Sequence, residues 1–440
     1  MARLFGTDGV RGVAGEELTY ELAVALGRAA VRVLGCKIVI GRDTRVSGPM
    51  LEAGLVAGIC AEGGSALVAG VIPTPGIALI TREANCDCGI VISASHNPPE
   101  YNGIKFFSSD GFKLPDAVED ELQAYAESVL GEEVAQGEAV VLEDACETYV
   151  NHAVEVLRGQ GISLEGLTIA LDCAHGAACE TTPAALKALG ATVYAINTDP
   201  DGANINVECG STHLEPVTAL LNECGADIAL AHDGDADRML AVAPDGTVVD
   251  GDYILAICAK DMKQRGCLAA NTVVGTVMAN LGFMQAMKHE GIDVVSTKVG
   301  DRYVLESMRE LGAAIGGEQS GHVIFLEHNT TGDGLMTALA LLAVVARSGS
   351  SLAELMQVME KFPQCLVNVR VTDKALYAAN EAIAAAEQAA IEQLGDDGRL
   401  LVRASGTEPL IRVMVEAKTQ DDAERIAGEV AAVVKAQIGA

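Results

Sequence analysis

Long apolar runs, a basic net charge and paired cysteines are all missing from this 440-residue chain. The longest apolar run, LMTALALLAVVA over residues 335–346, is too short and too alanine-rich to span a bilayer, so we expect a buried helix there. The opening residues, MARLFGTDGVRG, contain no apolar segment of the kind that a secretory signal needs. These features predict a cytoplasmic protein without a membrane partner.

Basic residues are scarce, because 30 lysines and arginines stand against 61 acidic residues, for a formal net charge of −31. Such a charge opposes binding to nucleic acid or to an anionic membrane surface. A small anion would have to be held by local arginines, and several lie in glycine-rich or turn-rich segments. For an average arginine of this chain, solvated surface charge is the simpler interpretation. The candidates are Arg3, Arg11, Arg42, Arg45, Arg302, Arg403 and Arg412.

The twelve cysteines form no CxxC pair, and the closely spaced Cys86 and Cys88 lack the second pair that a zinc site would need. We therefore expect reduced, mostly buried thiols. The chain also lacks a Walker A motif and a GxGxxG motif, so the sequence does not indicate a nucleotide ligand.

A strand–helix–strand pattern recurs three times along the chain. The predicted elements are 36–41, 49–62 and 65–70 in the first repeat, 167–172, 181–189 and 191–197 in the second, and 271–277, 281–290 and 293–299 in the third. Such alternation is typical of α/β layers. The acidic stretch 116–147 looks helical and is expected to close the first module.

The pattern changes after residue 365 to a strand, an alanine-rich helix at about 374–394, a hairpin and a last helix at about 420–437. We therefore predict an α/β protein with three related mixed α/β domains and a smaller C-terminal α+β domain. The predicted domains cover residues 1–150, 151–251, 252–364 and 365–440.

Ser95 directly follows a buried strand, CGIVIS, at the edge where parallel sheets expose their functional loops. The surrounding residues do not match GxSxG, so an esterase-type nucleophile is not indicated. His96 is not an obvious base for Ser95, since adjacent side chains on an extended backbone point in opposite directions. Ser95 therefore needs another activator, and taken alone the stretch SHNPP is also compatible with a simple polar turn.

Three aspartates alternate after the predicted strand 226–232, and they are Asp233, Asp235 and Asp237. Carboxylates at this spacing indicate a divalent cation. An EF-hand is excluded, because Arg238 stands where that loop requires glycine and Pro244 where it requires glutamate. The set favours a hard ion such as Mg²⁺, which keeps positions open for phosphate oxygens.

Two further loops offer polar groups for a ligand. The loop GGEQSGHVIF has donors and acceptors suited to sugar hydroxyls or an amine, namely Glu318, Ser320 and His322. The hairpin RASGTEPLIR offers guanidinium and backbone N–H groups suited to a phosphate. Its candidate residues are Arg403, Ser405, Gly406, Thr407 and Arg412.

Six motifs in this order, GTDGVRG, ISASHNP, NGIKFF, DGDADR, GEQSGH and RASGTEP, resemble those of the α-D-phosphohexomutase family. They extend over residues 6–409, essentially the whole chain. The resemblance implies four domains around a central cleft, in agreement with the modules above. The stretches LFGTDGVRG, HNTTGDGL and SGTEPLIRVMVE, together with Gln319, resemble the amino-sugar branch of the family. That branch interconverts glucosamine 6-phosphate and glucosamine 1-phosphate for UDP-N-acetylglucosamine synthesis.

The resemblance implies that Ser95 is phosphorylated in the active enzyme and completes a Mg²⁺ site with the three aspartates. A glucosamine 1,6-bisphosphate intermediate would reorient between two transfers, and this compound or glucose 1,6-bisphosphate would act as activator. His96 and Lys105 would assist in proton transfer or charge stabilisation, with Lys105 the better proton shuttle. Arg11 and Arg42 would be supporting cations.

The same resemblance implies contacts to the substrate. Glu318, Ser320 and His322 would orient the sugar, and Asp301 and Arg302 would face the substrate from another loop. The hairpin residues Arg403, Ser405, Gly406, Thr407 and Arg412 would hold the phosphate that is not reacting.

Two alternatives stay open at this point. A phosphomannomutase/phosphoglucomutase would differ in the loop from Glu318 to His322. A non-catalytic sugar-phosphate sensor would use the same cleft, although the presence of Ser95 together with three aspartates argues against lost catalysis. The expected partner is a small hexosamine phosphate, and a homodimer is possible.

Overall fold

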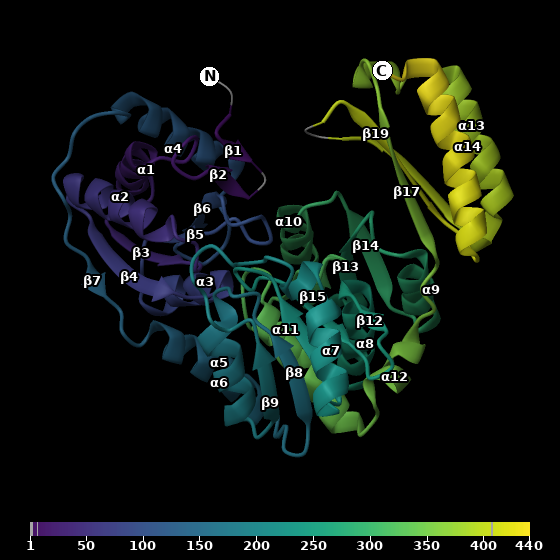
Figure 1. Ribbon diagram of the computed structural model, residues 1–440, viewed down its shortest axis with the longest axis horizontal. Helices are drawn as coiled ribbons and strands as arrows, with labels where there is room; N and C mark the ends of the chain where they lie inside the picture. The colour runs from purple at the N-terminus through teal and green to yellow at the C-terminus, as the bar shows by residue number, and fades with distance from the viewer. Residues whose placement is uncertain (1–2, 7, 406–407) are drawn as a thin grey trace. The chain divides into compact units, whose positions relative to one another are not determined.

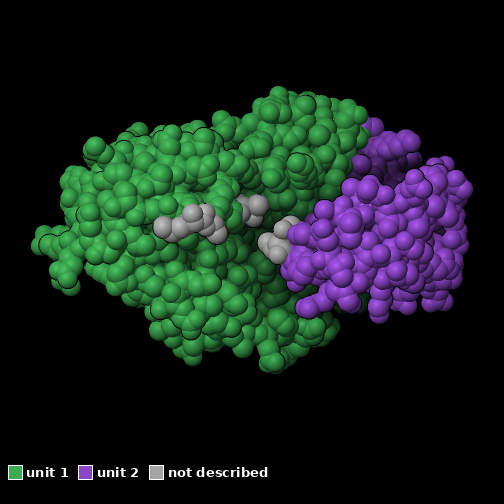
Figure 2. All heavy atoms as spheres, turned by 90° about the horizontal axis from the view of Figure 1, so that it is seen from above, with its two compact units in different colours: residues 1–278, 292–358 green, residues 279–291, 359–440 purple. Residues whose placement is uncertain are grey.

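The computed structural model describes residues 3–6, 8–405 and 408–440 (Figure 1). The chain forms two compact units, which Figure 2 colours green and purple. Unit 1 comprises Met1–Met278 and Ile292–Val358, and unit 2 comprises Ala279–Gly291 and Met359–Ala440. Unit 1 contains the loop of Ser95 (the serine loop), the loop of Asp233, Asp235 and Asp237 (the aspartate loop) and the loop 318–322 (the sugar loop). The predicted phosphate hairpin, with Arg403 and Arg412, belongs to unit 2.

The first sheet of unit 1 has seven strands in the order β1-β2-β6-β5-β3-β4-β7. Strands β5, β3, β4 and β7 are parallel, whereas β6 and β2 run antiparallel to their neighbours. The strands are β1 (Phe5–Gly6), β2 (Gly9–Val13), β3 (Lys37–Arg42), β4 (Ser65–Val71), β5 (Cys88–Ile92), β6 (Tyr101–Ser108) and β7 (Val140–Val141).

Helices cover both faces of this sheet (Figure 1). Ile38 and Ile40 alternate along β3 and pack into one core with the helices on the first face. On the other face Gly41 and Gly89 lack side chains, and a Cβ at either would meet Ile77 of the opposite helix at 2.6–3.1 Å. Glycine at these positions lets that helix, α3, approach closely. The helices are α1 (Tyr20–Val33), α2 (Gly48–Ala61), α3 (Thr74–Glu83) and α4 (Asp116–Val129).

The second sheet has the order β12-β11-β10-β8-β9, with β10, β8 and β9 parallel and β11 antiparallel to β10. Its strands are β8 (Thr168–Asp172), β9 (Thr192–Ile196), β10 (Ile228–His232), β11 (Met239–Val242) and β12 (Val248–Val249). The accompanying helices are α5 (Ala145–Gly159), α6 (Ala178–Ala188), η1 (Gly210–Thr212) and α7 (Glu215–Cys224).

The third sheet has the order β14-β13-β15-β16, in which only the β15–β16 pair is antiparallel. Its strands are β13 (Thr272–Thr276), β14 (Asp293–Thr297), β15 (Ile315–Gly317) and β16 (Val323–Phe325). The helices are α8 (Gly251–Gln264), η2 (Ala269–Asn271), α10 (Asp301–Leu311), α11 (Gly334–Ser348), α12 (Leu352–Leu355) and η3 (Met356–Val358).

The three sheets share one feature that positions the functional loops. In each sheet a parallel strand is followed in sequence by an antiparallel strand, as β5–β6, β10–β11 and β15–β16. The serine loop, the aspartate loop and the sugar loop are the three connections within these pairs. Three related α/β folds thus place their polar loops at equivalent positions.

Unit 2 has a three-stranded antiparallel sheet in the order β17-β19-β18, packed against two long helices. The buried Glu416 carboxylate of β19 accepts hydrogen bonds from Asn280 Nδ2 and from Leu281 N, at the start of α9. The elements are α9 (Leu281–His289), β17 (Gln364–Arg370), η4 (Lys374–Leu376), α13 (Glu381–Leu394), η5 (Gly395–Asp397), β18 (Arg399–Ala404), β19 (Leu410–Glu416) and α14 (Gln420–Ile438).

The predicted strands and helices of the three α/β repeats are confirmed within a few residues at their ends, and all twelve cysteines are free thiols. The prediction of one helical stretch over 116–147 was wrong. Helix α4 ends at Val129, and Gly131 follows with a φ of 83°. The predicted helix at 374–394 begins only at Glu381, because Asn380 caps it with its side chain.

The predicted buried helix at 335–346 is confirmed as part of α11, most of whose residues are buried. Of the helices in the described ranges, none is both long and apolar enough to cross a membrane by itself. The pair Gly334–Ser348 and Leu352–Val358, bent by 95°, passes that test jointly by length and composition.

Candidate active site

Ser95 lies in the turn after β5, where its backbone is left-handed with a φ of 52°. The residue is buried, and its Oγ donates a 2.5 Å hydrogen bond to Asp233 Oδ2. Its backbone N–H donates to Ser93 Oγ at 2.9 Å. A polar surface turn would leave the hydroxyl in water, so burial against a carboxylate favours a functional serine.

The three aspartates of the loop after β10 come together as the sequence predicts. One carboxylate oxygen from each of Asp233, Asp235 and Asp237 lies within 4.8 Å of the other two, and all three residues are buried. Burial and the neighbouring carboxylates raise the pKa of Asp233 well above its usual range and also raise the pKa of Asp237. This concentration of negative charge calls for a cation.

The donor set fits a hard divalent cation. Within the described part of the chain, no hydrogen-bond donor reaches Oδ1 of Asp235 or Oδ1 of Asp237, although both atoms are buried. Buried carboxylate oxygens are costly unless a partner compensates them. Three carboxylates beside a serine oxygen are the hard ligands that Mg²⁺ and Ca²⁺ take. The triad could therefore bind a metal ion.

Lys105, on β6, supplies a positive charge to the same cluster. Its Nζ lies 2.8 Å from Asp235 Oδ2, 3.1 Å from Asp8 Oδ2 and 3.7 Å from Asp237 Oδ2. Burial alone would lower the pKa of Lys105, but the three carboxylates outweigh burial and raise this pKa. Lys105 is therefore held as an ammonium group beside the acidic loop.

A second buried lysine, Lys113, joins two carboxylates that are far apart in the sequence. Its Nζ forms ion pairs with Asp8 and with Asp301. Asp8 also contacts Lys105, and His322 Nε2 lies 3.5 Å from Asp301 Oδ2. These pairs form one charge network that extends from the acidic loop to the sugar loop.

A cavity of about 460 Å³ opens beside this network, which is within the size range of small-molecule sites. The predicted site residues that line it are Arg11, His96, Asp237, Asp301, Glu318 and His322. Arg3 and Arg238 also line it. Local cations thus face the cavity despite the strongly acidic composition of the chain.

Family models match four consecutive parts of the chain. Three are the alpha/beta/alpha domains I, II and III of phosphoglucomutase/phosphomannomutase, over residues 2–131, 147–246 and 250–362. The fourth is the C-terminal domain of the same proteins, over residues 366–433. The chain belongs to the phosphoglucomutase/phosphomannomutase family. It is therefore a phosphohexomutase, an enzyme of the isomerase class.

Curated and solved relatives agree with this assignment. The chain is 49% identical over 449 residues to a phosphoglucosamine mutase of Clostridium tetani, with 99% of each chain covered. A phosphoglucomutase/phosphomannomutase family protein from Burkholderia thailandensis is 27% identical, with a TM-score of 0.83 over 99% of this chain and 97% of that one. An Aspergillus fumigatus N-acetylphosphoglucosamine mutase, solved with GlcNAc-6P and magnesium, shares the fold at 18% identity and a TM-score of 0.70, with 99% and 96% covered.

Two arginines predicted for the phosphohexomutase site point elsewhere. Arg42 Nε donates to Glu52 Oε2 at 3.3 Å, and its Nη1 contacts the Asp43 carbonyl oxygen at 3.4 Å. Arg302 pairs with Asp116 at 2.5 Å and with Glu306 at 3.0 Å. Neither arginine is among the described residues that line the 460 Å³ cavity.

His96 lies closer to Ser95 than the sequence argument allowed. Its Nδ1 is 3.3 Å from Ser95 Oγ. The expectation of opposite side chains assumed an extended backbone, whereas the positive φ of Ser95 turns the two side chains toward each other. Burial, together with Arg238 and Arg11, lowers the pKa of His96 to about 4, so the ring is neutral near pH 7.

The sugar loop between β15 and β16 presents its polar groups in different ways. Glu318 Oε1 accepts a 3.0 Å hydrogen bond from Gly300 N, and Gln319 Nε2 donates to Asp252 Oδ2 at 3.3 Å. Ser320 Oγ is buried and makes no hydrogen bond to any residue in the described ranges. Ser320 is also absent from the described residues that line the 460 Å³ cavity.

The predicted phosphate hairpin lies in unit 2, and part of it can be described. Arg403 and Arg412 are directly opposite each other on β18 and β19. Burial and the charge of Arg412 lower the pKa of Arg403. Ser405 is buried, and its Oγ accepts a 3.3 Å hydrogen bond from Glu408 N. The remaining two predicted residues, Gly406 and Thr407, lie outside the described residues.

Sequence reasoning missed several residues that contact the candidate site residues or the loops that carry them. Asp8 stands inside the GTDGVRG motif, three residues before Arg11, so the motif itself was a usable signal. Lys113 had no such signal, because only folding brings it to Asp8 and Asp301. Thr74 and Asn206 likewise contact the aspartate loop and the serine loop from remote positions. Arg45, which the sequence offered only as one of several candidate cations, contacts the serine loop.

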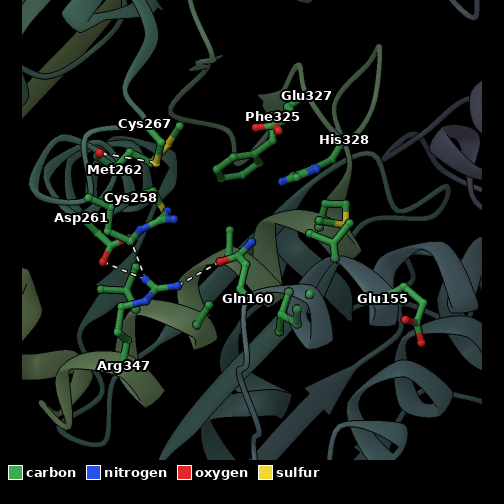
Figure 3. Close-up of a pocket in the computed structure, with 18 residues that line it drawn as sticks. Glu155, Gln160, Cys258, Asp261, Met262, Cys267, Phe325, Glu327, His328 and Arg347 are labelled. Carbon is green, nitrogen blue, oxygen red and sulfur yellow. Dashed lines mark hydrogen bonds and ion pairs between the residues drawn. The ribbon is translucent and has the colours of Figure 1, made fainter.

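A second cavity, of about 440 Å³, lies between α5, α8 and α11 (Figure 3). None of the predicted site residues that the structure describes lines it. Its arginine Arg347 already donates to both oxygens of Asp261 and to Gln160 Oε1, as the dashed lines show. Six of the predicted site residues line the first cavity instead, which makes it the candidate active site.

Proposed function

We propose that this protein is a phosphoglucosamine mutase, which interconverts glucosamine 6-phosphate and glucosamine 1-phosphate and thereby serves UDP-N-acetylglucosamine synthesis. The observation that carries the proposal is the 2.5 Å hydrogen bond from Ser95 Oγ to Asp233, inside a buried acidic triad at the edge of a sugar-sized cavity. The full-length similarity to phosphoglucosamine mutases supports the choice of substrate.

In the proposed reaction, phosphorylated Ser95 donates its phosphoryl group to one end of the hexosamine phosphate. The product of this transfer is glucosamine 1,6-bisphosphate, which reorients and returns its other phosphate to Ser95. Covalent catalysis of this kind divides one difficult transfer into two easier ones. Glucosamine 1,6-bisphosphate or glucose 1,6-bisphosphate would act as activator by phosphorylating a free Ser95.

The four metal-binding candidates are Ser95, Asp233, Asp235 and Asp237, and Mg²⁺ is the ion that we propose. When bound, it would neutralise charge on the transferring phosphoryl group. The contacts of Lys105 and His96 favour different roles from those that the resemblance implied. Lys105 is held as an ammonium group and suits charge stabilisation, whereas the neutral His96 beside Ser95 Oγ suits proton acceptance.

The cavity offers separate groups for the sugar and for its phosphates. Glu318, Ser320 and His322 would orient the sugar, and Asp301 would contact it from the neighbouring loop. Arg11 would attract the phosphate at the cavity. For Arg42 and Arg302, whose side chains pair with carboxylates, we propose an indirect role at most.

The non-reacting phosphate would be held by the hairpin residues Arg403, Ser405, Gly406, Thr407 and Arg412. Supporting this proposal, like charges directly opposite each other in a sheet are destabilising. Arg403 and Arg412 are such a pair, and Glu408 Oε2, 3.4 Å from Arg412 Nη2, offsets part of the repulsion. An anion between the two arginines would offset the rest.

Substrate choice is tested by kcat/KM with Mg²⁺ and a trace of sugar bisphosphate on glucosamine, glucose and mannose phosphates, with Ser95→Ala in parallel. We expect a strong preference for glucosamine phosphate that disappears in Ser95→Ala. A preference for mannose or glucose phosphate would instead indicate a phosphomannomutase/phosphoglucomutase. Binding of all three without turnover, in both proteins, would indicate a sugar-phosphate sensor. The cytoplasmic location and the homodimer stay predictions.

A further inference from the structure

Arg45 lies fully buried against the loop that carries Ser95. An arginine side chain has five N–H donors, and here all of them are used. Nε donates to Asp43 Oδ2 at 2.9 Å. The other four donate, over distances of 2.5–3.0 Å, to the backbone carbonyl oxygens of Ser95, Asn97, Pro98 and Tyr101.

Asp43 extends this grip to the other side of Ser95. Its carboxylate is fully buried, and its Oδ2 accepts a 2.6 Å hydrogen bond from Ser93 Oγ. Ser93 Oγ in turn accepts the 2.9 Å hydrogen bond from the Ser95 N–H. One connected cluster therefore fixes both the N–H and the C=O of Ser95.

Asn206 grips the same carbonyl groups from the second α/β fold. Its Nδ2 donates to the Ser95 carbonyl oxygen at 2.8 Å and to the Asn97 carbonyl oxygen at 3.1 Å. The loop of the aspartates also packs here, because a Cβ on Gly234 would lie 2.7 Å from the Ser95 carbonyl oxygen. Arg45 and Asn206 thus converge on Ser95 from separate elements.

This arrangement answers a physical need of the serine. A non-glycine residue in the left-handed region is strained, and it persists only where its surroundings over-determine its conformation. A nucleophile that gains and loses a phosphoryl group in each turnover must return to the same place, since a displacement of about 1 Å can cost about 100-fold in rate.

We infer that Arg45 and Asn206 are positioning residues for phosphoryl transfer, which clamp the carbonyl groups of Ser95 and Asn97 so that Ser95 Oγ stays directed at Asp233. Both act through the loop rather than on the substrate. The inference rests on the proposed function, because it requires Ser95 to be the phosphoryl acceptor. Arg42, which the family resemblance offered as a supporting cation, instead contacts Glu52 and the Asp43 carbonyl oxygen.

The test uses Arg45→Lys and Asn206→Gly in the full-length enzyme. Lysine keeps a positive charge beside Asp43 but offers three donors in place of five. Glycine removes the Nδ2 donor and tolerates the φ of 60° at position 206. We expect the rate of Ser95 phosphorylation by glucose 1,6-bisphosphate, followed by intact mass, to fall about 10- to 100-fold. The KM for glucosamine 6-phosphate should change less than about twofold.

Two matched controls carry the same substitutions away from the clamp. Asn85→Gly replaces an exposed asparagine with a φ of 51°, and Arg158→Lys replaces a surface arginine. Both should phosphorylate Ser95 at the wild-type rate. A purely structural role for the clamp would lower thermal stability without changing this rate in the folded fraction. If Arg45→Lys does not fold, Asn206→Gly still decides, because it removes only a neutral donor.

The outcomes separate this inference from the proposed function. If wild-type enzyme gains no phosphoryl group, or Ser95→Ala gains one equally, the proposed function fails. If wild-type enzyme is labelled at Ser95 and Asn206→Gly is labelled at the same rate, the clamp inference is overturned while the proposed function stands. Slow labelling of the folded variants with an unchanged KM supports the clamp.

Discussion

Asp235 differs from the two aspartates beside it because two donors contact its Oδ2 atom. Lys105 Nζ lies at 2.8 Å and Thr74 Oγ1 at 2.6 Å. Burial alone would raise the pKa of Asp235, but these contacts outweigh burial and lower it. One carboxylate of the triad is thus ionised over a wide pH range, which gives a cation a fixed anchor.

Metal binding can be tested through stability, independently of turnover. A cation that binds the folded triad should stabilise the protein by about 2.7 kcal/mol at a concentration 100 times its Kd. We expect Mg²⁺ to raise the Tm of wild-type protein and of Asp245→Asn, an exposed control. The same ion should leave the Tm of Asp237→Asn nearly unchanged. An equal rise in Asp237→Asn would show that Mg²⁺ binds elsewhere.

The ion pair between Lys113 and Asp301 leads to a prediction about the pH dependence of catalysis. Burial favours the protonated form of Asp301, but Lys113 and His322 outweigh burial and lower its pKa. Lys113→Met should therefore raise the pKa of Asp301 and move the acidic limb of the kcat/KM profile to higher pH. Profiles measured over about pH 4–8 check this shift. Lys113→Arg, which keeps the charge, should retain the wild-type limb, and an unmoved limb in Lys113→Met would contradict the role of this pair.

At the scale of elements, the site is built from three similar strand pairs. Strands β5, β10 and β15 each end in a polar loop and are followed by an antiparallel strand. The strand ends were visible in the sequence as apolar runs followed by polar residues. Helix α11 has no acidic side chain in its first turn, and the side chain of Asp333 caps its N-terminus instead.

The cap of α11 yields a prediction about stability. Asp333 Oδ1 accepts hydrogen bonds from Met336 N at 2.9 Å and from Tyr149 Oη, on α5, at 2.7 Å. Tyr149 and Asp333, which form the second of these hydrogen bonds, are both fully buried. Tyr149→Phe should therefore cost about 1.5–3 kcal/mol in unfolding free energy. Urea denaturation checks the value, with Tyr194→Phe on the exposed edge of β9 as the control that should change little.

The whole molecule carries a formal net charge of −31, which opposes compaction through repulsion between like charges. Salt screens such repulsion, with a Debye length of about 10 Å at 0.1 M. We expect the Tm to rise between about 0.02 and 0.2 M NaCl, and an equal osmolality of sucrose to raise it less. A Tm that falls with salt would mean that attractive ion pairs dominate the balance.

Much of the fold follows from local sequence. The apolar runs at 36–41 and 226–232 predicted strands, and the structure contains them as β3 and β10. The end of α4 was not predicted, because the acidic residues after Val129 suit a helix as well as a loop. Helix propensity is a weak preference that tertiary contacts override.

The sequence by itself determined which residues we propose to carry the chemistry: a serine after a buried strand, three alternating aspartates and a lysine on the returning strand. The position of the serine and of the aspartates in the chain fixed their place at the end of a strand, because a loop begins where its strand ends. Only the tertiary structure decided their partners. Arg45, Asn206, Lys113 and Thr74 reach the site through contacts between segments distant in the chain. Such contacts arise when distant segments pack together, within one fold or between two, and no local spacing encodes them.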